Sequence, residues 1–285
     1  MSENFFIIDG HSQLYQAYYA ITGLTTPKGQ PINAVYGFTR MLRKIIREDK
    51  PCYMAIAFDT KGPTFRHTEY KEYKSHRKPT PDDLVSQIPL LYDVIDAYNI
   101  PLYAIQGFEA DDIIGTISKK LSKEHIECTI ITIDKDMDQL IDKHIRIFNP
   151  RKKEIRDIEK LRKEKGIVPE NVIDILALGG DSSDNIPGIP GIGYKTALNL
   201  IREWKSLENV ISNVDKIKGK KKQENLLKYT ELARLSKRLA TINTKVPLDF
   251  NLEACRLTDF NNIKLNELFT NYGFKSFIAE NHDNN

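Results

Sequence analysis

Short runs of apolar residues recur through the first half of the chain. The runs are rich in β-branched side chains and too short for helices, so each predicts a buried strand. The five runs lie at residues 5–8, 53–58, 102–105, 129–133 and 145–148.

Between these runs, apolar residues recur every three or four positions, which predicts helices with one buried face. Before the second helix, Thr80 and Pro81 suit a helix cap and a first helical position, whereas Pro89 should kink the helix. Strands that alternate with helices predict an α/β fold, a mostly parallel sheet flanked by helices. The three patterns are Val35, Phe38, Leu42 and Ile45; Leu84, Ile88, Leu91, Ile95 and Tyr98; and Ala110, Ile114, Ile117 and Leu121.

The pattern changes at about Ile167. Helical spacing and turns rich in Gly and Pro replace the strands, and no convincing strand precedes Pro247. We therefore predict two parts, an α/β part at residues 1–166 and a helical part at residues 167–285.

Composition adds little by itself. No apolar run approaches the length of a membrane span and no signal peptide begins at Met1, so we expect a cytoplasmic protein without a membrane partner. Three cysteines without paired spacing do not predict a zinc site or a disulfide framework. A net charge of +3 does not mark a nucleic-acid binder, although basic residues gather at 40–47, 61–78, 151–165 and 216–238. Any one of these runs could be a solvated helix face.

Acidic residues follow the predicted strands. Asp9, Asp59 and Asp134 come directly after the first, second and fourth strands, and Asp136 follows two residues later. After the third strand, Glu109, Asp111 and Asp112 open a helix. Because the carboxyl ends of parallel strands share one edge of a sheet, these acids should converge on one crevice.

Each acid alone has an ordinary explanation, because Asp forms turns and caps helices. Several carboxylates in one crevice, however, would repel one another unless cations neutralise them. Oxygen ligands with no nearby His or Cys set favour Mg²⁺ or Mn²⁺ over Zn²⁺. Two such ions about 4 Å apart would stabilise both the attacking and the leaving oxygen at phosphorus.

Two further acids, Asp181 and Asp184, lie far along the chain in a Gly-Gly-Asp-Ser-Ser-Asp segment. Their spacing allows both to face one way from a helical turn. A tight Gly-Asp turn is the alternative, and spacing alone does not bring this segment to the sheet edge.

Residues 186–197 read Ile-Pro-Gly-Ile-Pro-Gly-Ile-Gly-Tyr-Lys-Thr-Ala and precede a helix, which predicts a helix-hairpin-helix over about 186–204. The glycines permit a tight hairpin, and free N–H groups at the next helix would bind phosphate without reading sequence. A purely structural turn is the alternative. The candidate DNA contacts are Gly188, Ile189, Gly191, Ile192, Gly193, Lys195 and Thr196.

Residues 61–78 interleave basic side chains with Phe65, Tyr70 and Tyr73. Cations for phosphates and rings for bases suit a single strand, and a solvated loop is the alternative. Because this segment follows Asp59, it should lie above the proposed metal site.

With these motifs in order, the sequence resembles the 5′ nuclease domain of bacterial DNA polymerase I and its stand-alone flap endonuclease relatives, from about Phe5 to Ala279. The resemblance implies a PIN-like nuclease core at 1–166 with a helical arch at about 61–80, and a C-terminal helix-hairpin-helix region. The motifs are Ile-Asp-Gly at 8–10, Ala-Phe-Asp at 57–59, Phe-Arg-His at 65–67, Glu-Tyr-Lys at 72–74, Phe-Glu-Ala-Asp-Asp at 108–112, Asp-Lys-Asp at 134–136 and Gly-Asp-Ser-Ser-Asp-Asn-Ile-Pro-Gly at 180–188.

The resemblance also implies roles for single residues. Lys74 and Arg77 match the basic pair that orients the scissile phosphate, Arg66 matches a phosphate contact, and Tyr73 belongs to the same arch motif. The hairpin is expected to hold K⁺ on backbone carbonyls. One metal group comprises Asp9, Asp59, Glu109, Asp111 and Asp112, and the second comprises Asp134, Asp136, Asp181 and Asp184.

The function implied is a structure-specific 5′ nuclease of replication and repair, a monomer that cuts branched or 5′-flapped DNA with Mg²⁺ or Mn²⁺ in the bacterial nucleoid. Gln16 stands where the family usually has Arg, which removes an expected phosphate contact. Because the chain ends soon after Ala279, we expect a stand-alone nuclease or an isolated domain. A PIN-type ribonuclease and a catalytically silent scaffold for branched DNA remain the alternatives.

Overall fold

The computed structural model describes residues 3–282, with side chains described for residues 3–278. Within this range, six strands form one sheet in the order β3-β2-β1-β4-β5-β6. The first five are parallel and confirm the predicted strands, whereas β6 is antiparallel and has no apolar run that would predict it. The strands are β1 (Asn4–Asp9), β2 (Tyr53–Ala57), β3 (Leu102–Tyr103), β4 (Glu127–Ile131), β5 (Ile145–Asn149) and β6 (Glu154–Arg156).

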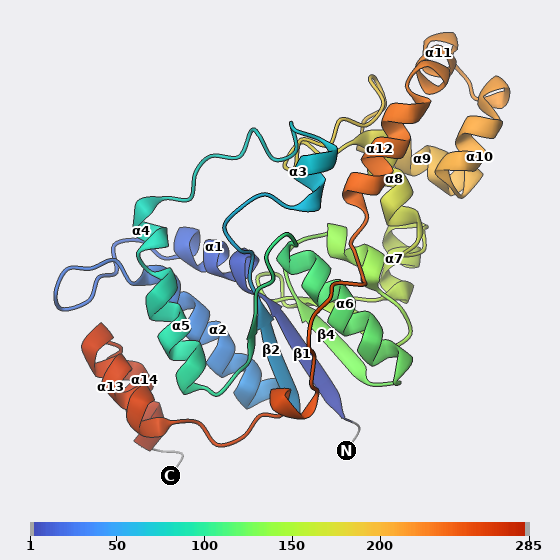
Figure 1. Ribbon diagram of the computed structural model, residues 1–285. Coiled ribbons are helices and arrows are strands. Elements are labelled where there is room, and N and C mark those ends of the chain that lie inside the picture. Colours follow the sequence, from blue (N-terminus) through green and yellow to red (C-terminus); the bar gives the residue numbers. More distant parts are fainter. Residues whose placement is uncertain (1–2, 283–285) are drawn as a thin grey trace.

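Helices cover both faces of the sheet (Figure 1). Successive side chains of a strand point to opposite faces, so Phe6 and Ile8 of β1 pack into one layer and Phe5 and Ile7 into the other. This is why the central strands β1 and β2 are almost entirely apolar. The first layer contains α1 (Gly10–Ala20), α2 (Asn33–Asp49), α5 (Ile88–Ala97), α13 (Asn262–Tyr272) and α14 (Lys275–His282), and the second contains α6 (Ala110–Lys123) and α7 (Ile158–Lys165).

The second predicted helix is divided into α4 (Asp82–Val85) and α5. Pro89 lies in the first turn of α5, where no backbone N–H is required, so it helps to start a helix and does not kink one. Gln87 lies at the break, and its side chain accepts from the Ala34 N–H at 2.8 Å. Thr80 was expected to cap this helix but instead bonds the Tyr15 hydroxyl at 2.6 Å.

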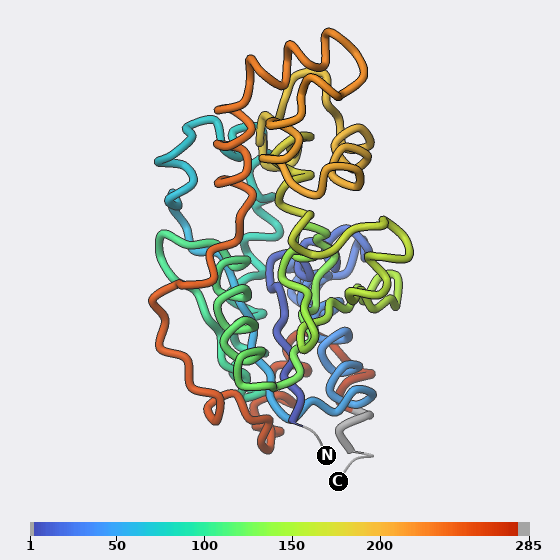
Figure 2. The backbone as a smooth tube through the Cα atoms, turned by 90° about the vertical axis from the view of Figure 1, so that its right-hand side faces the viewer, coloured from blue at the N-terminus to red at the C-terminus, as the bar shows by residue number. Residues whose placement is uncertain are grey.

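A second core lies above the sheet layers (Figures 1 and 2). Its helices pack around buried residues such as Leu178, Ile201 and Leu226. No helix among residues 3–282 has the length and apolar character needed to cross a bilayer. The helices of this part are α8 (Asn171–Gly179), α9 (Tyr194–Trp204), α10 (Leu207–Ser212), α11 (Lys220–Lys228) and α12 (Thr230–Ala240).

The chain after α12 returns to the sheet layers, as Figure 2 shows. It passes so close to α6 that a Cβ atom on Gly115 would lie 2.6 Å from Ile242 Cγ2. Leu265 and Phe269 of α13 then join the core of the first layer. Residues 242–282 therefore share the core of the α/β part, although their sequence pattern is helical.

Candidate active site

Five of the acids predicted near the strand ends line one cleft of about 1330 Å³ at the carboxyl edge of the sheet: Asp9, Asp59, Glu109, Asp111 and Asp134. Asp9 is the last residue of β1, Asp59 follows β2 and Asp134 follows β4. Basic side chains from the segment after β2 line the same cleft. The charged residues of the lining are Asp9, His11, Asp59, Lys61, Lys74, Arg77, Lys78, Glu109, Asp111, Asp134, Lys135 and Arg151.

Asp9 is held at both carboxylate oxygens. One accepts from the Ser12 N–H at 3.0 Å as the cap of α1, and the other accepts from the Thr132 hydroxyl at 2.8 Å. The Thr132 oxygen also accepts from the Asp134 N–H at 3.0 Å, which ties two of the acids together. Gly10 is required here because a Cβ atom would lie 2.4 Å from the Phe58 ring. Thr132 was not predicted, although a buried hydroxyl beside a strand-end acid is a usable signal.

The sequence predicted Asp59 as a site residue but did not predict its neighbour His11. The Asp59 carboxylate accepts from the Ala110 N–H at 2.7 Å, and so joins β2 to the start of α6. His11 Nδ1 accepts from the Asp59 N–H at 3.1 Å and was not predicted. Burial lowers the pKa of His11 despite the nearby Asp59 carboxylate, so the ring favours its neutral form.

Four acids make no ion pair with any residue that the structure describes. Burial raises the pKa of Asp9 to about 7 against the hydrogen bonds from Ser12 and Thr132. Burial and the Asp134 charge raise the pKa of Asp136 to about 8. The pKa values of Asp111 and Asp134 are also raised, first by burial and then by neighbouring carboxylates.

Glu109 and Asp184, in contrast, are paired with basic side chains. Lys74 Nζ lies 2.6 Å from Glu109 Oε1 and 3.7 Å from Asp184, and Arg77 donates to Asp184 at 2.5 Å. The Tyr73 hydroxyl lies 3.0 Å from carboxylate oxygens of both acids. Burial raises the pKa of Asp184, but Lys74 and Arg77 outweigh burial and hold it below the ordinary value.

The segment that carries these cations, residues 61–81, contains one short helix, α3 (Phe65–Glu69), followed by turns. The turns rest on the loop that contains Asp184. The Lys74 N–H donates to the Asp184 carbonyl at 2.9 Å, and the Asn185 side chain donates to the Glu72 carbonyl at 2.6 Å. These contacts bring Asp184 to the cleft, which its spacing in the sequence could not show.

Arg66 and Asp112 lie apart from the cleft in a buried pair. Arg66 is 2% exposed, and its five N–H groups donate to Asp112, Glu109, the Leu239 carbonyl and the Thr241 carbonyl. Both Asp112 oxygens accept from Arg66 at 2.8 Å and also from backbone N–H groups. Arg66 therefore has no donor left for a phosphate, and Asp112 has no free lone pair for a metal. The pair instead joins the segment after β2 to α6 and α12.

The predicted hairpin connects α8 to α9. Gly188 has φ of 61°, and a Cβ atom on it would lie 2.3 Å from the Gly180 nitrogen, so the two segments touch through backbone alone. Ile189 and Ile192 are buried in the helical core, which leaves Gly191 and Gly193 exposed at the turn. The start of α9 exposes Lys195 and half-exposes Thr196.

Two family models cover this arrangement. Residues 4–167 match the N-terminal resolvase-like domain of 5′-3′ exonucleases, and residues 167–263 match the C-terminal SAM fold of the same proteins. The chain belongs to the 5′-3′ exonuclease family. DNA polymerase I of Bacillus caldotenax is 42% identical over 98% of this chain, and that of Bacillus subtilis is 39% identical over 95%. The chain spans 32% and 31% of the length of these two relatives.

Solved structures of other proteins have the same fold. A zinc-bound T5 5′-exonuclease has a TM-score of 0.71 at 23% identity, covering 85% of this chain and 90% of its own. The catalytic core of Rad2 in complex with DNA substrate has a TM-score of 0.64 at 16% identity, covering 95% and 88%. The predicted fold, a PIN-like sheet with a helical C-terminal region, is confirmed.

The cleft of this chain fits a hard divalent cation by its donors. Asp9, Asp111, Asp134 and Asp136 offer only oxygen ligands, and their pKa values are raised first by burial and then by neighbouring carboxylates. A bound cation would offset both effects. As they stand, no three His, Cys, Asp or Glu side chains in residues 3–282 are arranged to hold an ion. The Lys74 ammonium beside Glu109 provides positive charge among them.

Proposed function

We propose that the chain is a divalent-metal-dependent 5′ nuclease, acting as a 5′-3′ exonuclease and 5′-flap endonuclease on branched DNA. The observation that carries this proposal is a group of buried acids that make no ion pair among the described residues, beside a basic segment, in a chain of the 5′-3′ exonuclease family. Acids alone would indicate metal binding, and the basic segment adds a place for phosphate.

Eight of the predicted acids are proposed to hold Mg²⁺ or Mn²⁺, with two ions in all. When bound, such ions lower the pKa of water and stabilise charge on a phosphoryl group. Thr132 and Ser12 fix the orientation of Asp9, and the Asp136 N–H fixes Asp134 at 2.8 Å. Asp112 is left out because Arg66 and backbone groups occupy its oxygens. The eight are Asp9, Asp59, Glu109, Asp111, Asp134, Asp136, Asp181 and Asp184.

Lys74 and Arg77 are proposed to bind the scissile phosphate. Lys74 now pairs with Glu109 and Asp184, and Arg77 pairs with Asp184. Both cations would be available to a phosphate once metal ions neutralise those carboxylates. At the phosphate, their N–H groups would orient the group for attack and stabilise its developing negative charge. Tyr73, hydrogen-bonded within reach of both acids, would keep the carboxylates aligned.

The hairpin is proposed to hold duplex DNA beside the cleft. Exposed N–H groups at Gly193 and the start of α9, together with Lys195 and Thr196, suit a phosphate contact that ignores base sequence. Gly188, Gly191 and the buried isoleucines shape the turn, and its carbonyls could hold K⁺. Branched DNA would then place its duplex on the hairpin and its loose 5′ strand at the basic segment.

A labelled 5′-flap duplex incubated with Mg²⁺, with Mn²⁺ or with excess EDTA tests this proposal. We expect cleavage near the junction with either ion and none with EDTA. Single-stranded RNA of equal length is the competitor, because a PIN-type ribonuclease would cut it in preference to the flap. Binding of the flap without cleavage in any metal would indicate a silent scaffold and contradict the proposal.

A further inference from the structure

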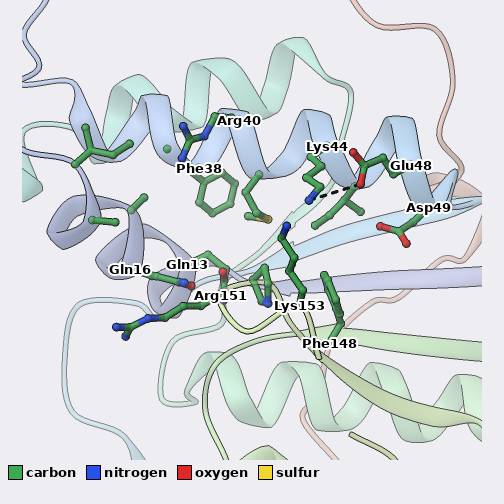
Figure 3. Close-up of a pocket in the computed structure, with 17 residues that line it drawn as sticks. Gln13, Gln16, Phe38, Arg40, Lys44, Glu48, Asp49, Phe148, Arg151 and Lys153 are labelled. Carbon is green, nitrogen blue, oxygen red and sulfur yellow. Dashed lines mark ion pairs between the residues drawn. The ribbon is translucent and has the colours of Figure 1, made fainter. Parts of the chain in front are cut away.

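A second cavity, of about 450 Å³, lies between α1, α2 and the turn after β5 (Figure 3). Its volume is in the range of small-molecule sites, which begins at about 300 Å³. Phe38, Met41 and Phe148 give it apolar walls. None of these residues has a part in the cleavage chemistry described above.

Two of the glutamines that line this cavity each have one buried amide atom without a partner. Gln13 is 3% exposed, and its Nε2 atom has no hydrogen-bond partner. The Oε1 atom of Gln16, which also lines the cavity, is buried and unpaired as well. A buried polar atom without a partner destabilises a fold, so these amides indicate a ligand that offers both an acceptor and a donor.

The rim of the cavity carries unneutralised positive charge. Among the described residues, Arg40, Arg151 and Lys153 make no ion pair, and Figure 3 shows Lys44 and Lys153 pointing toward one another from opposite walls. Lys44 has an exposed partner, Glu48, at 3.6 Å. Cations that face one another across a cavity favour an anion between them.

The same cavity borders the catalytic cleft. Gln16, Ala20 and Arg151 line both spaces. A ligand in the cavity would therefore lie beside the acids that are proposed to cut the strand. At the opposite end, Glu48 and Asp49 would repel a long polyanion, so the cavity suits a ligand with one phosphate group.

We propose that this cavity binds a 5′-phosphorylated nucleotide, with its phosphate on Arg40, Arg151 and Lys153 and its base between the apolar walls and the two glutamine amides. The inference rests on the proposed nuclease function, because cleavage of a 5′ strand end releases nucleotides that carry a 5′-phosphate. Two sources supply such a nucleotide: the free mononucleotide product and the terminal nucleotide of a 5′-phosphorylated strand.

Binding can be measured separately from cleavage, by calorimetric titration of dAMP in excess EDTA, with deoxyadenosine and inorganic phosphate as partial ligands. We expect dAMP to bind more tightly than either part. Arg40→Gln and Lys153→Gln should each weaken dAMP binding about tenfold, since each removes a charge-assisted contact. Lys152→Gln is the matched control, because Lys152 is an exposed neighbour outside the cavity lining and should leave the affinity unchanged.

Gln13→Leu separates a ligand contact from a structural one. Leucine is close in size and has no polar atom, so the ligand-free variant should melt at the same temperature as the parent or higher. The rise in melting temperature caused by dAMP should be lost. A lower melting temperature in the absence of ligand would show that the amide serves the fold and would count against the site.

Cleavage of 5′-phosphorylated and 5′-hydroxyl strand ends distinguishes the two sources. If the strand end is bound, Arg40→Gln slows only the phosphorylated substrate; if free product is bound, it instead weakens inhibition by dAMP on both. Failure of dAMP to bind at millimolar concentration overturns this inference, as does binding of dAMP by Arg40→Gln and Lys153→Gln with the affinity of the parent chain. That failure leaves Mg²⁺-dependent flap cleavage untouched, whereas loss of cleavage with intact dAMP binding contradicts only the nuclease proposal.

Discussion

Two groups of acids at one sheet edge differ in whether a basic side chain pairs with them and in the direction of their pKa shifts. Glu109 and Asp184 each lie against Lys74, and the pKa of Asp184 is below its ordinary value. Asp9 and Asp136 make no ion pair among the described residues, and burial raises their pKa values to about 7 and about 8. The basic segment therefore supplies counter-charge to Glu109 and Asp184. The remaining acids require cations from solution to be ionised together near neutral pH.

The largest effect is expected for an acid of the unpaired group. Asp134→Ala should reduce single-turnover cleavage of a 5′-flap duplex by roughly a thousandfold or more, because a proposed metal ligand is lost. Binding of the flap in EDTA should be nearly unchanged. Asp249→Ala, an exposed acid outside the cleft, is the control. Full activity of Asp134→Ala would remove this residue from the metal site.

Breaking the buried pair of Arg66 and Asp112 should lower the free energy of unfolding more than breaking an exposed ion pair does. Arg66→Met leaves the Asp112 charge buried and uncompensated, so the free energy of unfolding should fall by about 3–5 kcal/mol. Arg77→Met removes an ion pair whose Arg side chain is 53% exposed, and should cost less than about 1 kcal/mol. Urea unfolding followed by circular dichroism measures both changes. Equal losses would mean that burial does not separate the two arginines.

Lys74 forms ion pairs with Glu109 and Asp184, and it lines the same cleft as the unpaired acids Asp9 and Asp134. Lys74→Ala should lower the turnover number about 10- to 100-fold, because a charge proposed to stabilise the phosphoryl group is lost. The same change should decrease the Mg²⁺ concentration for half-maximal binding, since the ammonium no longer competes with cations for Glu109. Lys74→Arg should preserve more activity than alanine does. A weaker affinity for Mg²⁺ in Lys74→Ala would show that Lys74 supports the metal and does not replace it.

The sequence predicted the positions of the strand-end acids better than it predicted the roles of Arg66 and Asp112. Asp9, Asp59 and Asp134 were placed correctly because a parallel sheet brings every strand end to one edge. The roles of Arg66 and Asp112 depend on residues more than a hundred positions away, such as Leu239 and Asn243, which no local pattern reveals.

The fold shows the same limit. Apolar runs predicted β1 to β5, whereas β6 is a short edge strand without one. The return of α13 to the first layer also depends on long-range packing, because its helical pattern does not say which core it joins. Local periodicity thus predicted elements, and a shared sheet edge predicted part of the site.

The smallest effect, on pH-dependent stability, separates the groups by sign. Asp9 and Asp136 bind protons more tightly in the folded chain than in the unfolded chain, whose Asp pKa is about 3.9. Their contribution to stability is therefore complete below about pH 4 and is lost as the pH rises through about 7 to 8. Asp184 behaves oppositely, since its lowered pKa gives stability above about pH 4 that is lost on acidification.

In EDTA, the melting temperature should therefore fall between pH 5 and pH 8, by an amount equivalent to about 1–3 kcal/mol. Mg²⁺ should remove most of this slope, because a bound cation favours the ionised carboxylates. Asp136→Asn should flatten the slope without Mg²⁺, whereas Asp184→Asn should lower stability by a similar amount across this range. A flat melting profile for the parent chain in EDTA would mean that the unpaired acids are already neutralised by the protein, and the contrast between the two groups would disappear.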